Sequence, residues 1–180
     1  MTDNNGKVFD TAPTDERSPE EMRVYELLQK LGVHYTRTDH DAAQTMEDCQ
    51  QAEKLLDVKI CKNLFLCNRQ KTVFYLLMMP ADKPFKTKDL SAQIGSSRLS
   101  FAGEEFMQEL LGVTPGSVSV LGLMNDKDNK VNLLIEKDVL SEEYFGCHPC
   151  KNTSSMRISV KDLTEIILPA IGHEYAEVEL

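Results

Sequence analysis

Two short segments of the chain carry residue types that could do chemistry. The first, Cys147-His148-Pro149-Cys150, sets an imidazole between two thiols, which is the pattern of half a zinc site. Structural zinc needs four ligands, usually from two such pairs, and the other closely spaced cysteines, Cys61 and Cys67, are six positions apart. We therefore expect no metal here. A cysteine nucleophile paired with His148 is also disfavoured, because adjacent residues rarely present their side chains to each other.

The second segment is Lys62-Asn63, directly before an apolar run. On composition alone, Lys62 would be an ordinary solvated lysine. Among the four histidines, His148 is the strongest candidate, because Gly146 and Pro149 shape the backbone around it. His40 lies in a predicted loop between two aspartates, and a structural and a functional role both stay open for it.

Signature motifs of several enzyme classes are missing from the sequence. The chain has no GxGxxG or GxxxxGK[ST] stretch, which would bind a nucleotide phosphate. It also has no HExxH or GxSxG stretch, which mark zinc proteases and α/β-hydrolases. We therefore expect no bound cofactor.

Length and composition indicate one soluble domain. The 180 residues are 41% hydrophobic and 27% charged, and the longest apolar stretch, residues 73–80, is far shorter than the ~20 residues of a membrane span. The first 17 residues, rich in Asp, Asn and Thr, are expected to form a flexible tail before a single domain at 18–180. Five irregularly spaced cysteines and the absence of an apolar leader favour reduced thiols in the cytoplasm.

The net charge of −9 hides a strong gradient along the chain. Residues 1–53 carry −7, residues 54–100 carry +6 and residues 101–180 carry −8. A basic island in an acidic chain can hold phosphate locally without binding polyanions everywhere. Lysines that only solubilise one face would explain the same island.

Local signals predict the elements that must position these residues. Ser18-Pro19-Glu20-Glu21 combines a serine N-cap, a first-turn proline and a capping-box glutamate, so it predicts a helix that ends at Gly32. Further signals predict helices at about 45–56, 87–94, 103–111 and 159–167, and strands at 33–38, 63–67, 72–79, 118–123, 131–136 and 154–158. The strand pairs 63–67 with 72–79 and 118–123 with 131–136 are each expected to form a hairpin. Because strands and helices are interspersed without strict alternation, we expect an α/β fold of the α+β type, a mixed sheet packed with helices.

Four motifs together resemble a known family. They are KNLFL at Lys62–Leu66, GSSRLSFA at Gly95–Ala102, LGVTPGSV at Leu111–Val118, and His148-Pro149 followed by Asn152-Thr153. Their order and spacing resemble the YbaK/ProX family of aminoacyl-tRNA deacylases, most closely its free-standing ProXp-ala branch. They are similar also to the editing insertion domain of bacterial prolyl-tRNA synthetases. The resemblance covers roughly residues 18–170 and implies a mostly antiparallel, curved sheet.

The resemblance implies a trans-editing enzyme that hydrolyses the ester of Ala-tRNA(Pro). A synthetic site sized for proline cannot strongly exclude the smaller alanine, because each missing methylene is worth only ~1–3 kcal/mol, so a second sieve is needed. Two alternatives stay open: a deacylase of Cys-tRNA(Pro) or another small misacylated amino acid, and a non-catalytic tRNA- or synthetase-binding regulator. The implied partners are the acceptor end of tRNA(Pro) and, transiently, prolyl-tRNA synthetase or an elongation factor, with the chain itself a monomer.

The resemblance also assigns roles to residues of this chain. The family lysine falls on Lys62, which would hold the terminal phosphate or the ester region, and the histidine falls on His148, which would help fix the aminoacyl group. The attacking water would be activated with help from the ribose hydroxyl of the substrate. Substrate-binding roles are implied for six further residues: Asn63, Arg98, Gly116, Gly146, Asn152 and Thr153.

Two positions depart from the family pattern. The family often has proline four residues after the glycine at position 116, and this chain has Val120, which would leave the loop looser. Cys150-Lys151 follows His148-Pro149 and adds a thiol and a charge near the expected pocket.

Overall fold

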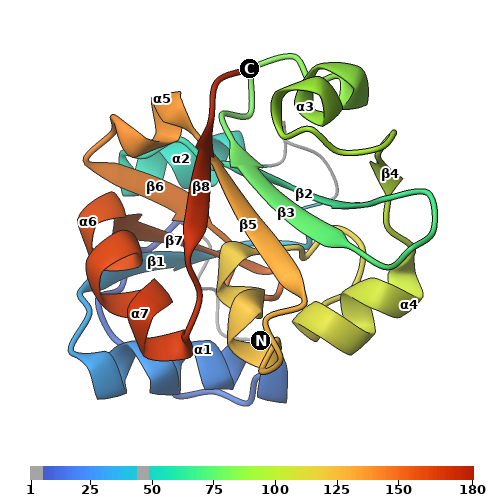
Figure 1. The fold of residues 1–180 in the computed structure, drawn as a ribbon. Coiled ribbons are helices and arrows are strands. Elements are labelled where there is room, and N and C mark those ends of the chain that lie inside the picture. The colour runs from blue at the N-terminus through green and yellow to red at the C-terminus, as the bar shows by residue number, and fades with distance from the viewer. Residues whose placement is uncertain (1–5, 44–48) are drawn as a thin grey trace.

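Two β-sheets occupy the centre of the molecule, and helices pack around them (Figure 1). The computed structural model describes residues 6–43 and 49–180. Within them, a three-stranded antiparallel sheet has the order β1-β7-β6, and a five-stranded mixed sheet has the order β4-β2-β3-β5-β8. The strands are β1 (Tyr35–Asp39), β2 (Lys62–Cys67), β3 (Phe74–Met79), β4 (Ser100–Phe101), β5 (Val131–Glu136), β6 (Tyr144–Cys147), β7 (Ser154–Ser159) and β8 (Tyr175–Val178). The fold is therefore of the predicted mixed α/β class, with its strands divided between two sheets.

The helical segments include two that contain π-helical turns. They are α1 (Pro19–Leu31), α2 (Gln50–Leu56), α3 (Thr87–Gln93), α4 (Glu104–Phe106), η1 (Met107–Leu111), η2 (Val120–Asn125), α5 (Lys137–Leu140), α6 (Val160–Asp162), η3 (Leu163–Ile167) and α7 (Leu168–Ile171). The π-helical turns η1 and η3 directly continue α4 and α6. The predicted helix at 103–111 is thus confirmed, and the predicted helix at 159–167 continues to Ile171.

Helix α1 begins and ends where its capping residues predict. The Ser18 side chain accepts a hydrogen bond from the Glu21 backbone N–H, and Gly32 closes the helix with a left-handed φ of 67°. The apolar face of α1, including Val24 and Leu28, is buried in the main core. Of the predicted second helix, the structure shows α2 at 50–56, and its expected start at Thr45 lies outside the described residues.

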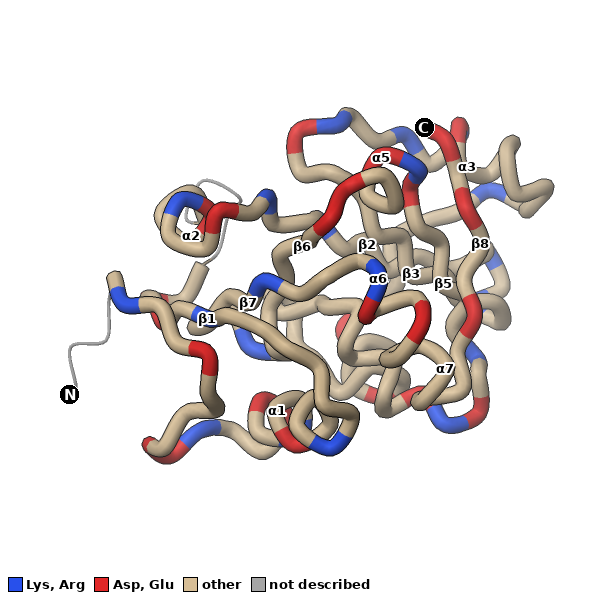
Figure 2. The backbone as a smooth tube through the Cα atoms, turned by 90° about the vertical axis from the view of Figure 1, so that its left-hand side faces the viewer, with Lys and Arg blue, Asp and Glu red and all other residues tan. Residues whose placement is uncertain are grey.

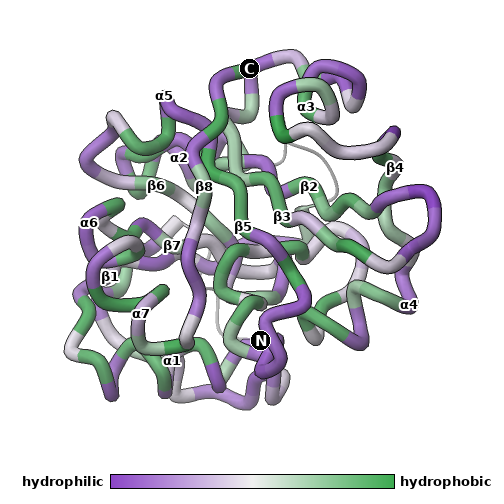
Figure 3. The backbone as a smooth tube through the Cα atoms, in the orientation of Figure 1, coloured by the Kyte–Doolittle hydropathy of each residue, from purple (hydrophilic) through white to green (hydrophobic). Residues whose placement is uncertain are grey.

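The hairpin of β2 and β3 is confirmed, with Lys62 paired to Met79 at one end and Cys67 to Phe74 at the other. The second predicted hairpin is wrong. Residues 120–125 form the 3₁₀ helix η2, because the Ser119 side chain caps its N-terminus by accepting from the Leu121 N–H. Strand β5 pairs instead in parallel with β3 and β8. It is an interior strand, and β3 and β5 are hydrophobic along most of their length (Figure 3).

The boundary between an N-terminal tail and a domain at residue 18 stays a prediction. Among residues 6–17, Phe9 is bridged to the free edge of β1: its N–H donates to the Arg37 carbonyl at 2.9 Å, and the Arg37 N–H donates back at 2.8 Å. The Arg37 guanidinium also lies 4.5 Å from the centroid of the Phe9 ring. No helix among the described residues is long and apolar enough to cross a membrane.

The two sheets are joined by a backbone contact between Ile60, just before β2, and Gly146 in β6. The Gly146 N–H donates to the Lys59 carbonyl at 3.0 Å, and the Cys61 N–H donates to the Gly146 carbonyl at 2.9 Å. A Cβ at position 146 would lie 2.8 Å from Ile60 Cγ1 and 3.0 Å from Ile60 Cα. Glycine is therefore required for the sheets to approach this closely.

We expect Gly146→Ala to lower the free energy of unfolding by roughly 1–3 kcal/mol, because the new methyl group must push the two sheets apart. Urea unfolding of the purified variant measures this change. Gly103→Ala is the matched control: there the added Cβ meets only the carboxylate end of Glu105, an exposed side chain that can turn away. Equal losses in the two variants would contradict the steric argument.

Candidate active site

Lys62 is the first residue of β2 and is half-buried. Its ammonium donates to the backbone carbonyl of Ala81 at 3.4 Å and to that of Lys83. Because an ammonium has three N–H donors, these contacts leave one donor for another group. Burial lowers the pKa of Lys62, and the carboxylate of Asp82 opposes this shift.

Asn63 extends from the opposite face of β2, since side chains alternate along a strand. Its Nδ2 donates to the Cys61 carbonyl at 3.4 Å. Its Oδ1 is buried and has no hydrogen-bond partner among the described residues. Asn63 thus has an unused acceptor on the face of β2 opposite to that of Lys62.

His148 directly follows β6 and has a defined tautomer. Its Nδ1 lies 2.8 Å from the carbonyl oxygen of Ser154 and 3.4 Å from the hydroxyl of Ser155. A carbonyl oxygen can only accept, so Nδ1 carries the proton and Nε2 is the acceptor atom of the neutral ring. Burial lowers the pKa of His148; the bond to Ser154 opposes this shift and nearby His40 adds to it. The ring is therefore neutral near pH 7.

His40, for which the sequence leaves a structural and a functional role open, is a neighbour of His148. The two ring centroids are 6.0 Å apart, and Ser155 lies between them: its hydroxyl is 2.8 Å from His40 Nε2. His40 Nδ1 lies 2.7 Å from the Asp41 carbonyl, so Nδ1 is protonated and Nε2 accepts from Ser155. These contacts depend on the pairing of β1 with β7, which sequence spacing does not reveal.

A buried ionic network supports the backbone that holds His148. The Asp39 carboxylate accepts from Arg17 at 2.8 and 3.2 Å, from Arg37 at 2.9 Å through both oxygens, and from the Ser154 hydroxyl at 2.6 Å. Burial acts to raise the pKa of Asp39, but these hydrogen bonds outweigh burial and lower it. Since the Ser154 carbonyl is the acceptor for His148, the network fixes the residue that orients the imidazole.

Asn152 and Thr153 connect the segment after His148 to two other parts of the chain. The Asn152 side chain donates to the Ala43 carbonyl at 2.8 Å, and its backbone N–H donates to the Ser117 hydroxyl at 3.2 Å. The Thr153 carbonyl accepts from the His40 N–H at 3.1 Å. Asn152 thereby links the His148 segment to the loop at 114–119.

The predicted loop glycine, Gly116, has a positive φ of 83°, and a Cβ there would lie 3.4 Å from Asn152 Nδ2. Val120, at the position where the family often has proline, is buried as the first residue of η2. The capped start of η2 therefore orders the end of this loop without a proline.

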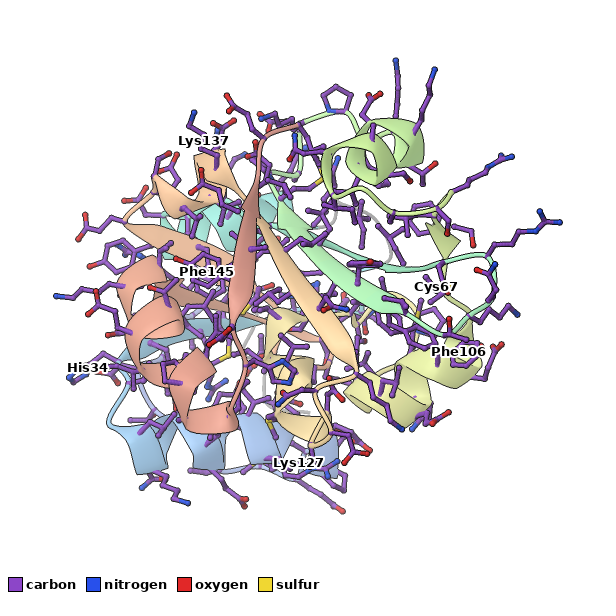
Figure 4. The ribbon with its side chains drawn as sticks, viewed as in Figure 1. His34, Cys67, Phe106, Lys127, Lys137 and Phe145 are labelled. Carbon is purple, nitrogen blue, oxygen red and sulfur yellow. The ribbon has the colours of Figure 1, made fainter. Side chains whose placement is uncertain are left out.

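The Ile60–Gly146 contact joins the two segments that carry the predicted catalytic residues. The bridge is parallel, so Lys62 and His148 each lie two residues beyond it in the same direction. Arg98 is exposed and lies apart, two residues before β4, where Phe101 pairs with Leu66 at the far half of β2. His34 is exposed at the periphery of the molecule and Phe145 is buried inside it (Figure 4).

The thiols of the CHPC segment are buried and poorly suited to nucleophilic attack. Burial raises the pKa of Cys150 to about 12 and raises that of Cys147 further. Burial also raises the pKa of Cys61 to about 12. A thiol with such a pKa is protonated at neutral pH and reacts slowly. Across the part of the chain that the structure describes, no three His, Cys, Asp or Glu side chains are grouped as metal ligands would be.

The surface near the segments that carry Lys62 and His148 has two hollows. A small hollow of about 200 Å³ lies between the end of β1 and α2 and is lined by residues including His40 and Asp39. A larger hollow of about 1110 Å³ lies on the other side of the Ile60–Gly146 contact and is lined by Ile60, Cys61 and Arg157 among others. Neither Lys62 nor His148 is among the residues that line these two hollows.

The site can be compared with known proteins. The family model of the aminoacyl-tRNA editing domain matches residues 40–166. The chain is 32% identical over 153 residues to the prolyl-tRNA editing protein ProX of Acetoanaerobium sticklandii, covering 85% of this chain and 93% of that protein. It is 32% identical over 161 residues to the prolyl-tRNA synthetase associated domain-containing protein 1 of Mus musculus, covering 86% and 94%.

A solved structure shows the same fold. The crystal structure of a candidate trans-editing enzyme for prolyl tRNA synthetase matches this chain with a TM-score of 0.67 and 18% identity, covering 92% of this chain and 99% of that one. The chain belongs to the aminoacyl-tRNA editing domain family, the YbaK/ProX family that its four motifs predict. It is an editing deacylase of the ProX type, a hydrolase.

We expect Asp39→Asn to lower the free energy of unfolding at pH 7 by roughly 3–5 kcal/mol, because the buried guanidinium of Arg37 loses its carboxylate partner and the half-buried guanidinium of Arg17 loses one of its partners. The folded-state pKa of Asp39 is lowered, so this stabilisation is present above about pH 4 and is lost as the pH falls through the folded-state pKa. Urea unfolding at several pH values therefore shows the difference from wild type narrowing in acid.

Asp15→Asn is the control for that experiment. Asp15 also binds Arg17, at 2.9 Å, but its side chain is 45% exposed, so its removal costs under about 1 kcal/mol. Equal, pH-independent losses in the two variants would show that burial of the Asp39 network does not matter.

Proposed function

We propose that this deacylase acts on mischarged tRNA(Pro), with Ala-tRNA(Pro) as its preferred substrate. The observation that carries the proposal is a pair of complementary groups on the two segments that the Ile60–Gly146 bridge joins: an ammonium with one unused donor at Lys62 and a neutral imidazole with an unused acceptor at His148. An aminoacylated 3′ end presents the matching pair, a phosphate or ester oxygen and an α-ammonium group. Two similar proteins are named for prolyl-tRNA editing and for association with prolyl-tRNA synthetase. Both names support tRNA(Pro) as the substrate.

Each group has a separate part in the proposed reaction. The third N–H of Lys62 binds the terminal phosphate or the ester region and holds the substrate end in place. Nε2 of His148 accepts a hydrogen bond from the α-ammonium group, which orients the aminoacyl group. A protonated His148 would repel the same ammonium, so the lowered pKa of His148 suits this part.

Water then supplies the nucleophile. Its oxygen bonds to the ester carbonyl carbon, the bond from that carbon to the ribose oxygen breaks, and the free amino acid and intact tRNA leave. A neighbouring ribose hydroxyl of the substrate assists the proton transfer. The buried, protonated thiols nearby support this route over a covalent cysteine intermediate.

Selection of alanine over proline requires a pocket that does not expand. The loop at Gly116 supports this requirement, because its neighbour Ser117 accepts from Asn152 and the end of the loop is capped into η2. Asn152 in turn is bound to Ala43. A rigid small pocket rejects proline by steric clash, whereas a loose one would accept it.

We expect fast hydrolysis of Ala-tRNA(Pro), with Pro-tRNA(Pro) spared. The test measures single-turnover deacylation of tRNA(Pro) charged with alanine, cysteine, serine or proline. Lys62→Ala removes most of the activity by weakening substrate capture, while Lys59→Ala, an exposed lysine three residues earlier, leaves it nearly unchanged. Preference for cysteine or serine would assign a different substrate within the same chemistry. No hydrolysis of any of the four would refute a proline-tRNA substrate.

The acid side of the pH profile reports on His148. Because burial lowers its pKa below the ordinary value near 6.5, activity stays constant down to about pH 6.5 and falls only at lower pH, as the ring becomes charged. His148→Gln keeps a polar side chain without the titrating ring, so its slower rate should lack this fall. A decline that begins above pH 7, or one that persists in His148→Gln, would contradict the assignment.

The protein's partners and location follow as proposals. Transient contact with prolyl-tRNA synthetase or an elongation factor would give access to freshly charged tRNA before it reaches the ribosome. A monomer in the cytoplasm suffices for this function.

A further inference from the structure

Phe101 is the most exposed large hydrophobic residue that the structure describes, with 61% of its surface accessible. It lies in β4, the two-residue edge strand of the five-stranded sheet, next to β2. An aromatic ring at a sheet edge gains nothing for the core when it is exposed to this degree. Such a ring is typical of a surface that binds a partner.

A second aromatic ring, that of Phe85, packs against Phe101. The ring of Phe85 meets it edge to face, with centroids 6.3 Å apart and an interplanar angle of 69°. Phe85 is half-buried and packs against the smaller core under α3. The geometry holds Phe101 in one orientation and leaves its surface open.

The two rings belong to the same face of the sheet as Lys62. Leu66 pairs with Phe101, and side chains two residues apart on a strand share a face, so Lys62 and Leu64 lie on this face as well. The loop before α3 contacts Lys62 and also carries Phe85. Its backbone carbonyls at Ala81 and Lys83 accept hydrogen bonds from the Lys62 ammonium. The loop that carries Phe85 is therefore held to the start of β2 by the ammonium of Lys62.

Basic side chains border this surface. Lys86, Lys88 and Arg98 are all exposed and flank the two rings in sequence, and residues 85–101 contain one acidic residue, Asp89. None of the three cations has an ion-pair partner among the described residues, in contrast to Lys83, which binds Glu136 and Asp138. The unpaired cations are free to bind phosphate.

We propose that Phe101 is a stacking platform for a base of the unpaired 3′ end of the tRNA, with Lys86, Lys88 and Arg98 binding the phosphates around it. This inference rests on the proposed tRNA substrate. Exposed aromatic rings beside cations are how proteins bind single-stranded nucleic acid without reading its sequence.

The dimensions of the surface fit such an end. Leu66 lies four residues after Lys62, a distance of about 13 Å along the strand at roughly 3.3 Å per residue. At the ~3.4 Å rise of stacked nucleotides, about 13 Å accommodates some four nucleotides. A terminal adenosine at Lys62 therefore places a preceding base over Phe101.

The other exposed surfaces suit an RNA less well. Tyr175 is 41% exposed on β8 at the opposite edge of the same sheet, but acidic residues follow β8 toward the C-terminus (Figure 2). The larger hollow beside Ile60 is lined by more acidic than basic side chains: Glu53, Asp57, Asp82, Asp138, Glu142 and Glu143 against Lys54, Lys59 and Arg157. Both surfaces would repel phosphate.

The experiment compares two uncharged RNAs, a tRNA(Pro) acceptor minihelix with its unpaired 3′ end and the same minihelix trimmed to a blunt end. Wild-type protein should bind the untrimmed RNA more tightly. Phe101→Ala should weaken binding of the untrimmed RNA roughly tenfold and leave the trimmed RNA unaffected, because stacking is lost only where there is a base to stack. Phe101→Trp should retain the affinity. Tyr175→Ala, the matched control on the opposite edge, should change neither.

If Phe101→Ala weakened the binding of both RNAs equally, or of neither, the proposal would be overturned. The exposed rings would then be better explained as a binding surface for a protein partner. Thermal unfolding of Phe101→Ala checks that the exposed substitution leaves the fold intact. Since uncharged RNA is not hydrolysed, this result is independent of activity. Binding coupled to Phe101 without deacylation would refute the proposed reaction alone, and deacylation without that coupling would refute the platform alone.

Discussion

The close approach of Gly146 to Ile60 is the constraint on which the rest of the structure depends. Each sheet is formed by its own hydrogen bonds, and this short backbone contact joins β6 of one to the entry of β2 in the other. The sheets can meet only because position 146 has no Cβ. We propose that the contact also positions the reacting groups, because Lys62 and His148 each follow it by two residues on the two segments that it joins. A substitution that separates the sheets would separate the two groups as well.

The imidazole is held by a second arrangement of buried groups. Asp39, bound by Arg17 and Arg37, fixes Ser154, whose carbonyl determines the protonated nitrogen of His148. Buried ion pairs are often no more stabilising than apolar packing, so their value here lies in geometry. The result is a neutral ring whose Nδ1 is protonated and whose Nε2 is an acceptor. Orientation and electrostatics, without a metal or a thiolate, are thus the protein's proposed contributions to hydrolysis.

Local signals predicted local structure well, while contacts between distant segments escaped them. The caps of α1 at Ser18 and Gly32 and the hairpin of β2 and β3 depend on neighbouring residues, and both are confirmed. The polar residues at 125–129 are typical of a hairpin turn, yet Ser119 caps a helix and β5 joins β3 in parallel. Strands β6 and β8 were missed because one contains a glycine and the other is a polar edge strand. Motif resemblance supplied Lys62 and His148, but His40 becomes a neighbour of the site only through the pairing of β1 with β7.

A crystal structure with a non-hydrolysable 3′-alanylamido-adenosine 5′-monophosphate, in which an amide replaces the ester, would test the joint role of Lys62 and His148 most directly. The analogue should lie between the two residues, with Lys62 Nζ donating to its phosphate or carbonyl oxygen and His148 Nε2 accepting from its α-ammonium group. Its alanine methyl group should face the loop at Gly116. An analogue bound in the small hollow beside His40, or in contact with only one of the two side chains, would contradict a shared site.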